Sequence, residues 1–155
     1  MSTNQDGPKV TSLRDLYAVA YQIEADAVTR YEMLAEQMDT HNNPELARIF
    51  RDLARAEGIH AAEFERLAGG ASIREHALAV AKWRRAESPE SADMADANYL
   101  MTRADALRMA LASEERALAF FRNLVITATD PELKSLAAHF AEEEAEHVEL
   151  CQRLL

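Results

Sequence analysis

The sequence predicts an all-α protein that folds as a four-helix bundle. Residues that interrupt helices are scarce, with four Gly and four Pro among 155 residues, whereas Ala, Leu, Glu and Arg abound. Apolar residues recur every three or four positions along four stretches, which is the period of an amphipathic helix. The last two stretches repeat the first two, as Pro131 repeats Pro44 at an offset of 87 residues. We therefore expect two similar helix pairs joined by a long crossover, which makes the second and third helices parallel.

The first helix is expected to follow a disordered tail over residues 1–11 and to end near Asp39. Ser12 and Asp15 have the spacing of a capping box, with Asp in place of the usual Glu. The inward-facing positions are apolar except for one carboxylate, and they are Tyr17, Tyr21, Glu24, Val28, Tyr31, Ala35 and Met38. Burying an unpaired carboxylate is costly or shifts its pKa strongly, so Glu24 needs a partner.

The second helix is predicted from its two ends. Asn43 and Pro44 suit the N-cap and the first helical position, and Gly69-Gly70 ends the helix near Ala68. Its inward-facing residues are Leu46, Phe50, Leu53, Glu57, His60, Phe64 and Leu67. The pattern loosens over residues 71–98, which we interpret as the crossover, and residues 72–85 could form a short extra helix within it.

The second helix pair repeats this pattern. The third helix is expected to start near Ala97 or Thr102 and to end near Thr129, and Asp130-Pro131 to begin the fourth. The inward-facing residues of the third helix are Leu107, Leu111, Glu114, Leu118, Phe121 and Val125. Those of the fourth are Leu133, Leu136, Phe140, Glu144, His147, Cys151 and Leu154. Residues 12–155 are thus expected to form one bundle domain.

Four Glu and two His interrupt these apolar faces, and the bundle should bring them to one level. Two of the Glu begin a Glu-x-x-His pair, in which the carboxylate and the imidazole lie one turn apart on the same face. Four clustered carboxylates repel one another in a protein core, whereas two divalent cations balance their charge. Oxygen-rich ligation with one imidazole per ion favours iron or manganese. The predicted metal ligands are Glu24, Glu57, His60, Glu114, Glu144 and His147.

Charge and cysteine content exclude several other classes of protein. The formal net charge of -10, from 27 acidic and 17 basic residues, argues against nucleic acid or an anionic membrane as a partner. The N-terminal stretch lacks the features of a signal peptide, and no apolar run is long enough to span a bilayer. Cys151 is the single cysteine, so an intramolecular disulfide and a Cys-x-x-Cys metal site are excluded. We expect a cytoplasmic protein.

The same residues allow simpler interpretations. Each Glu-His pair could face solvent on a charged helix, but both fall on an apolar face. Glu115 adjoins Glu114, although the seven-residue spacing to Phe121, equal to that from Glu24 to Tyr31, favours Glu114. Cys151 is expected to be a small buried residue. Glu143 could orient a ligand histidine from outside. The remaining histidines are expected at the surface, and they are His41, His76 and His139.

With these motifs the chain resembles the ferritin-like superfamily, in particular its rubrerythrin and bacterioferritin branch, from Leu13 to Leu155. The matching segments are Glu24 with Tyr31, residues 57–60, residues 114–121 and residues 142–147. The resemblance implies that Glu57 and Glu144 bridge two metal ions, that Glu24 and Glu114 are terminal ligands, and that His60 and His147 bind one ion each. It also implies a catalytic role for Tyr31, which would hydrogen-bond a ligand carboxylate or donate an electron. The counterpart of Tyr31 is Phe121, which has no hydroxyl.

The resemblance implies an oxidoreductase with two iron ions, or manganese in their place, that reduces dioxygen or hydrogen peroxide or oxidises ferrous iron. Its electron donor is left open, and a homodimer is expected. A non-catalytic iron-handling protein is the alternative, and a structural bundle that binds adventitious metal is the third. The chain carries no Cys-rich rubredoxin domain, and it has Ala117 where rubrerythrins have a further Glu. No haem is expected, because the fifth helix and haem-binding methionine of bacterioferritins are not matched.

Overall fold

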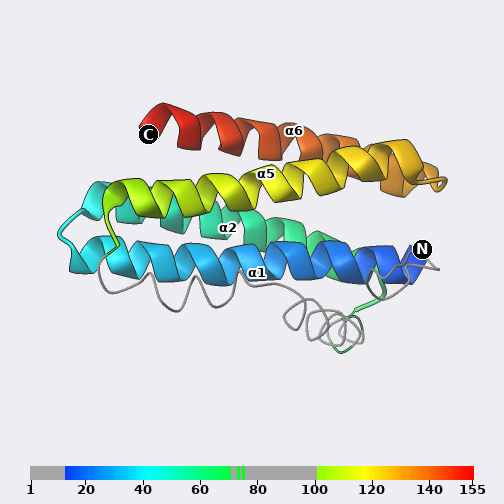
Figure 1. The fold of residues 1–155 in the computed structure, drawn as a ribbon. Coiled ribbons are helices and arrows are strands. Elements are labelled where there is room, and N and C mark those ends of the chain that lie inside the picture. Colours follow the sequence, from blue (N-terminus) through cyan, green and yellow to red (C-terminus); the bar gives the residue numbers. More distant parts are fainter. Residues whose placement is uncertain (1–12, 71–72, 74, 76–100) are drawn as a thin grey trace, which may run out of the picture.

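The computed structural model describes residues 13–70, 73, 75 and 101–155, which include four long α-helices (Figure 1). They are α1 (Leu13–Thr40), α2 (Pro44–Leu67), α5 (Arg103–Thr127) and α6 (Pro131–Leu154). The four helices lie side by side along their length. A turn joins α1 to α2 at one end of the bundle, and another joins α5 to α6 at the opposite end, so that α2 and α5 run in the same direction. The predicted all-α four-helix bundle is confirmed.

Local sequence signals set the helix ends. Asn43 and Asp130 cap α2 and α6, each accepting a hydrogen bond from the backbone three residues on, and proline follows each cap. Thr102 caps α5 in a capping box with Asp105, so Thr102 is the correct choice of the two predicted starts. This helix ends two residues before Thr129, because the backbone of Ala128 is already extended (ψ 137°) on its way to the cap of α6.

Turn residues follow α1 and α2. Asn42 has a positive φ of 61° in the turn between these helices, a conformation that asparagine tolerates better than most residues. Gly69 and Gly70 have φ values of 94° and 107° after α2. Those values favour glycine, so the predicted end of the second helix is set by backbone sterics.

The core consists of two apolar clusters with a polar band between them. One cluster lies toward the α1–α2 turn and is built around Tyr31, Met38, Phe50 and Leu107. The other lies toward the α5–α6 turn and contains Tyr17, Phe64, Phe121, Leu133 and Phe140. In each helix the predicted metal ligands fall between residues of these two clusters. The band is therefore shielded by apolar packing along the bundle axis in both directions.

Several predicted features lie outside the described residues. They are the tail over residues 1–11, the Ser12 cap, His76, and the crossover over 71–98 with its short extra helix, apart from residues 73 and 75. None of the four helices that the structure describes contains a segment apolar enough to cross a membrane.

Candidate metal centre

The structure brings all six predicted ligands together in the polar band. The four glutamates and His60 are buried, and His147 is partly buried. Glu115 is exposed, which resolves the ambiguity with its neighbour in favour of Glu114. The helical period thus turns one acidic residue of this adjacent pair inward and the other toward solvent.

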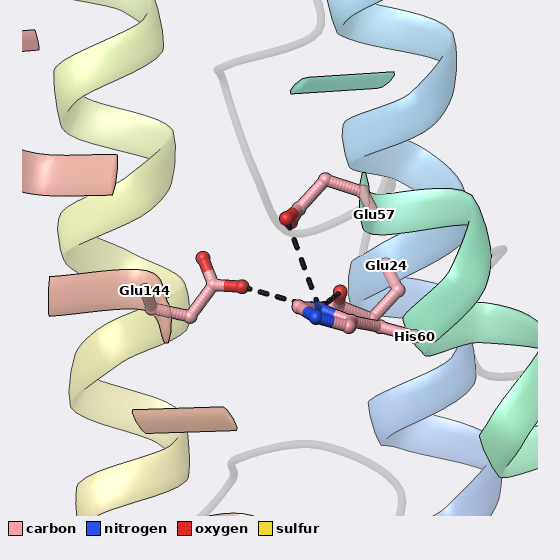
Figure 2. A group of neighbouring side chains, drawn as sticks. All are labelled: Glu24, Glu57, His60 and Glu144. Carbon is pink, nitrogen blue, oxygen red and sulfur yellow. Dashed lines mark hydrogen bonds and ion pairs between the residues drawn. The ribbon is translucent and has the colours of Figure 1, made fainter. Parts of the chain in front are cut away.

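The first group of ligand atoms surrounds His60 (Figure 2). Its Nδ1 atom lies 2.7 Å from Oε2 of Glu24, 3.5 Å from Oε1 of Glu144 and 3.8 Å from Oε1 of Glu57. The carboxylates come from α1, α6 and α2 and point toward the imidazole ring. One ligand atom from each of the four residues lies within 4.8 Å of the others.

A second group surrounds His147 and shares two members with the first. Nδ1 of His147 lies 2.9 Å from Oε2 of Glu114, 3.3 Å from Oε1 of Glu57 and 3.9 Å from Oε2 of Glu144. Glu57 and Glu144 thus belong to both groups, whereas Glu24 and Glu114 belong to one each. A carboxylate that bridges two metal ions must belong to both groups, and a terminal ligand to one. The arrangement therefore agrees with bridging by Glu57 and Glu144 and terminal binding by Glu24 and Glu114.

Unpaired oxygens test whether the residues fit a pair of metal ions. Oε1 of Glu24 and both carboxylate oxygens of Glu57 and Glu144 are buried without a hydrogen-bond partner among the described residues. Leaving such atoms unsatisfied in a protein core costs free energy. Carboxylate oxygens with one imidazole per group are ligands that iron and manganese accept. The six side chains therefore fit a di-iron site.

Burial and mutual repulsion shift the pKa values of the carboxyl groups. Burial raises the pKa of Glu24 to about 7, and it raises the pKa values of Glu57 and Glu114 to about 8. Burial also acts to raise the pKa of Glu144, but the nearby imidazoles of His147 and His60 outweigh it and lower that pKa to about 2. Glu144 is therefore the carboxylate that most strongly retains its charge.

The positive charge of the two histidines offsets the negative charge of the carboxylates. Burial acts to lower the pKa of His60, but the nearby carboxylates of Glu144 and Glu24 outweigh it and raise the pKa to about 11. Interactions with Glu114, Glu144 and Glu57 likewise outweigh burial and raise the pKa of His147. The surrounding carboxylates thus favour the protonated form of both imidazoles in the metal-free protein, and a metal ion that binds them competes with protons.

Tyr31 contacts the centre across the bundle. Its side chain is completely buried, and its hydroxyl donates a hydrogen bond of 2.7 Å to Oε1 of Glu114. The ring stacks on Phe50, with 5.8 Å between the ring centroids. The sequence indicated a hydrogen bond to a ligand carboxylate, and the structure identifies that carboxylate as Glu114 of α5, not Glu24 on the same helix. The catalytic role of Tyr31 stays a prediction.

Residues that contact the six ligands from outside were harder to predict from the sequence. Oε2 of Glu143 lies 3.0 Å from Nε2 of His60 and 3.3 Å from Nε2 of the exposed His139. The ring of His60 also stacks on Phe140 at 4.2 Å between centroids. The sequence suggested Glu143 only as a residue that could orient a ligand histidine. Glu143 follows His60 by 83 residues, the same separation as between Tyr31 and Glu114.

A further hydrogen bond between residues 83 apart lies next to the contact of Tyr31 with Glu114. Arg30 donates a hydrogen bond of 2.8 Å from Nη1 to Oγ of the buried Ser113. These residues immediately precede Tyr31 and Glu114, so two successive hydrogen bonds connect α1 to α5. The sequence analysis did not single out either residue.

Other residues lie as their sequence context suggests. His41 and His139 are exposed, and Cys151 is buried, where burial raises its thiol pKa to about 12. A surface cleft of about 310 Å³ between α2 and α6 is lined by none of the six predicted ligands. Its lining residues are Glu63, Leu67, Glu132, Ser135, Leu136 and His139.

A four-helix bundle that encloses two overlapping carboxylate–histidine groups defines a ferritin-like carboxylate protein. The sequence model of the Rubrerythrin family matches residues 15–155. The chain therefore belongs to the Rubrerythrin family. It is also similar to an uncharacterised conserved protein from Magnetospirillum magnetotacticum whose crystal structure is known. The two chains are 34% identical, with a TM-score of 0.68 over 92% of this chain and 93% of the other. No curated protein matches the chain significantly.

Proposed function

We propose that the protein binds two iron ions in the polar band and acts as an oxidoreductase that reduces hydrogen peroxide or dioxygen. The observation that carries this proposal is the overlap of the two ligand groups, in which Glu57 and Glu144 contact both histidines. Shared carboxylates keep two metal positions close enough to act on one small substrate. Membership of the Rubrerythrin family supports the choice of iron.

Held by the six side chains, two ferrous ions would supply the two electrons needed to convert hydrogen peroxide and two protons into two waters, and would act as Lewis acids on the substrate oxygens. The chain's own residues supply the surroundings. Glu57 and Glu144 provide negative charge between the metal positions, and Glu24 and Glu114 provide it on either side. The apolar clusters around Tyr31 and Phe140 restrict water along the bundle axis.

Proton handling at the centre follows from the contacts of its side chains. His60 and His147 give up a proton from Nδ1 when this atom binds a metal ion. Tyr31 holds Oε1 of Glu114 by hydrogen bonding, so that Oε2 faces His147 at 2.9 Å. We propose that the hydroxyl of Tyr31 fixes this carboxylate during oxidation of the metal pair.

A turnover experiment tests the proposal. The protein is loaded anaerobically with two equivalents of ferrous iron and then given an excess of hydrogen peroxide with an artificial reductant. An oxidoreductase consumes many equivalents of peroxide per chain, and Glu144→Ala abolishes this consumption. Peroxide consumption that is equal in the Glu144→Ala variant contradicts the proposed centre.

Iron handling is the second candidate, and one observation favours it. The two overlapping groups consist of carboxylates and histidines, and a centre of this kind can take ferrous iron itself as its substrate. An iron-handling protein oxidises about two ferrous ions per chain and then stops, even with reductant present. The same titration therefore separates the two candidates.

A further inference from the structure

The two ligand groups repeat each other in sequence but differ in the side chains behind them. We propose that the two metal positions are unequal, and that the position of Glu24 and His60 fills first because Glu143 holds His60 in place. This inference rests on the proposed dinuclear centre. It adds an order of filling and assigns Glu143 as a positioning residue for one metal position.

The two histidines differ in how firmly they are held. Nε2 of His60 contacts Glu143 at 3.0 Å, and the ring stacks on Phe140. Nε2 of His147 has no hydrogen-bond partner among residues 13–70 and 101–155, and its side chain is 15% exposed against 4% for His60. A metal-binding imidazole whose other nitrogen donates to a carboxylate is both oriented and made a better ligand. His60 has this support and His147 lacks it.

The two terminal carboxylates differ in the same direction. Oε1 of Glu24 has no hydrogen-bond partner among the described residues, and Oε2 contacts Nδ1 of His60 at 2.7 Å. Oε1 of Glu114 is already engaged by the hydroxyl of Tyr31 at 2.7 Å. This hydrogen bond occupies an oxygen of Glu114 whose counterpart in Glu24 is free, so Glu114 is the less available of the two ligands. Both observations favour the position of Glu24 and His60.

The sequence repeat shows where this inequality originates. Glu143 precedes Glu144, and the matching residue before Glu57 is Ala56, whose methyl group cannot accept a hydrogen bond from His147. Tyr31 follows Glu24 by seven residues, and the matching residue after Glu114 is Phe121. Each helix pair therefore has one polar side chain that the other pair lacks. Both of these side chains contact ligands across the bundle.

Manganese occupancy at each position tests the order of filling. Crystals of the protein prepared with one equivalent of Mn²⁺ per chain are measured for anomalous scattering. We expect the peak beside Glu24 and His60 to be about 10-fold or more stronger than the peak beside Glu114 and His147, matching the effect of such outer carboxylates on metal affinity. Two mutually repelling cations give stepwise titrations even at equal positions, so peak location is the informative measurement.

Matched variants test the role of Glu143. In Glu143→Ala the ratio of the first peak to the second should shrink by about 10- to 100-fold. The control is Glu142→Ala, which removes the same charge from an exposed neighbour on α6 and should leave this ratio unchanged. Glu143→Gln retains an accepting oxygen and should preserve part of the preference. Tyr31→Phe should strengthen the second peak. A variant whose fold is destabilised would weaken both peaks together. The ratio of the peaks therefore reports on the positioning of His60 by Glu143.

The outcomes separate this inference from the proposed function. Equal peaks in the wild-type protein, a stronger peak beside His147, or the same ratio in Glu143→Ala and Glu142→Ala would each overturn the unequal positions while leaving a dinuclear centre intact. Absence of both peaks at two equivalents of Mn²⁺ and at two equivalents of ferrous iron would overturn the centre itself, and the inference with it.

Discussion

Glu57 and Glu144 each contact two histidines, whereas Glu24 and Glu114 each contact one. Single substitutions should therefore have two distinct effects. Glu57→Ala or Glu144→Ala removes a carboxylate common to both positions and should abolish paired metal binding. Glu24→Ala or Glu114→Ala affects one position and should leave about one ion per chain. Metal content after dialysis against limiting Mn²⁺ measures the difference.

The exposed Glu115 provides the control for these variants. Glu115→Ala removes one negative charge next to Glu114 and should leave two ions bound. If all four ligand substitutions behaved like Glu115→Ala, the assignment of the centre would be wrong.

Tyr31→Phe removes one oxygen and keeps the ring that stacks on Phe50. We expect the fold and the binding of two ions to survive, because the packed volume hardly changes. Oxidation of the ferrous protein should be slower, because Glu114 loses its hydrogen-bond donor. Stopped-flow absorbance after mixing with oxygen measures this rate, and a wild-type rate would make Tyr31 a core aromatic residue only.

Gly58 lies between two residues of the Glu-x-x-His motif but has no steric need for glycine. A Cβ atom there would meet only Val28, at an ordinary contact distance of 3.8 Å to Cγ2. Gly58→Ala should therefore stabilise the protein by about 0.5–1 kcal/mol, through helix propensity and a less flexible unfolded chain. Urea unfolding of the metal-free protein measures the gain, and a loss of stability would reveal a close contact that the structure does not contain.

At the scale of single helices, α5 depends on the capping box at its start. Thr102 accepts from the backbone of Asp105, and Asp105 accepts from the backbone of Thr102. Thr102→Ala should cost about 1 kcal/mol of unfolding free energy. Thr29→Ala is the matched control, because Thr29 is exposed in the middle of α1, where alanine is the better helix former. Equal unfolding midpoints for the two variants would argue against the capping contribution.

The helices and the six clustered side chains were predictable because both follow from local sequence. Helical period decides which side chain turns inward, and the caps at Asn43 and Asp130 mark the helix starts. Contacts such as Glu143 with His60 depend on how far one helix pair is displaced along the other. Equivalent positions are 87 residues apart in α2 and α6 and 90 residues apart in α1 and α5, whereas the contacts of Glu143 with His60 and of Tyr31 with Glu114 join residues 83 apart. Sequence periodicity contains the offsets of the repeat but not the separation of these contacts.

At the scale of the whole molecule, the centre should make the stability of the metal-free protein depend on pH. Between their ordinary pKa of 4.5 and their raised values of about 7 to 8, Glu24, Glu57 and Glu114 bind more protons in the folded than in the unfolded state. The unfolding free energy therefore falls as pH rises through this range, by about 1.4 kcal/mol per pH unit for each extra proton bound. Thermal unfolding between pH 5 and pH 8 measures the slope.

Three other groups set the limits of this pH effect. His60 and His147 act in the same direction above their ordinary pKa of 6.5, and His60 does so up to about 11, so the fall should continue above pH 8. Glu144 acts in the opposite direction only between about 2 and 4.5, below the measured range. Protein loaded with two metal ions should show a much flatter profile. A stability that rises from pH 5 to pH 8 without metal would contradict a buried carboxyl cluster.

The polar band also has a consequence for how the two helix pairs align. The helical repeat allows one pair to slide along the other by one turn, about 5.4 Å, with apolar faces still opposite each other. Such a slide would carry Glu144 away from His60 and Glu57 away from His147, breaking both groups at once. Each pair contributes three members to its own group and one to the other. Bound ions would thus favour the one register that completes both groups, as a buried polar residue fixes the register of a coiled coil.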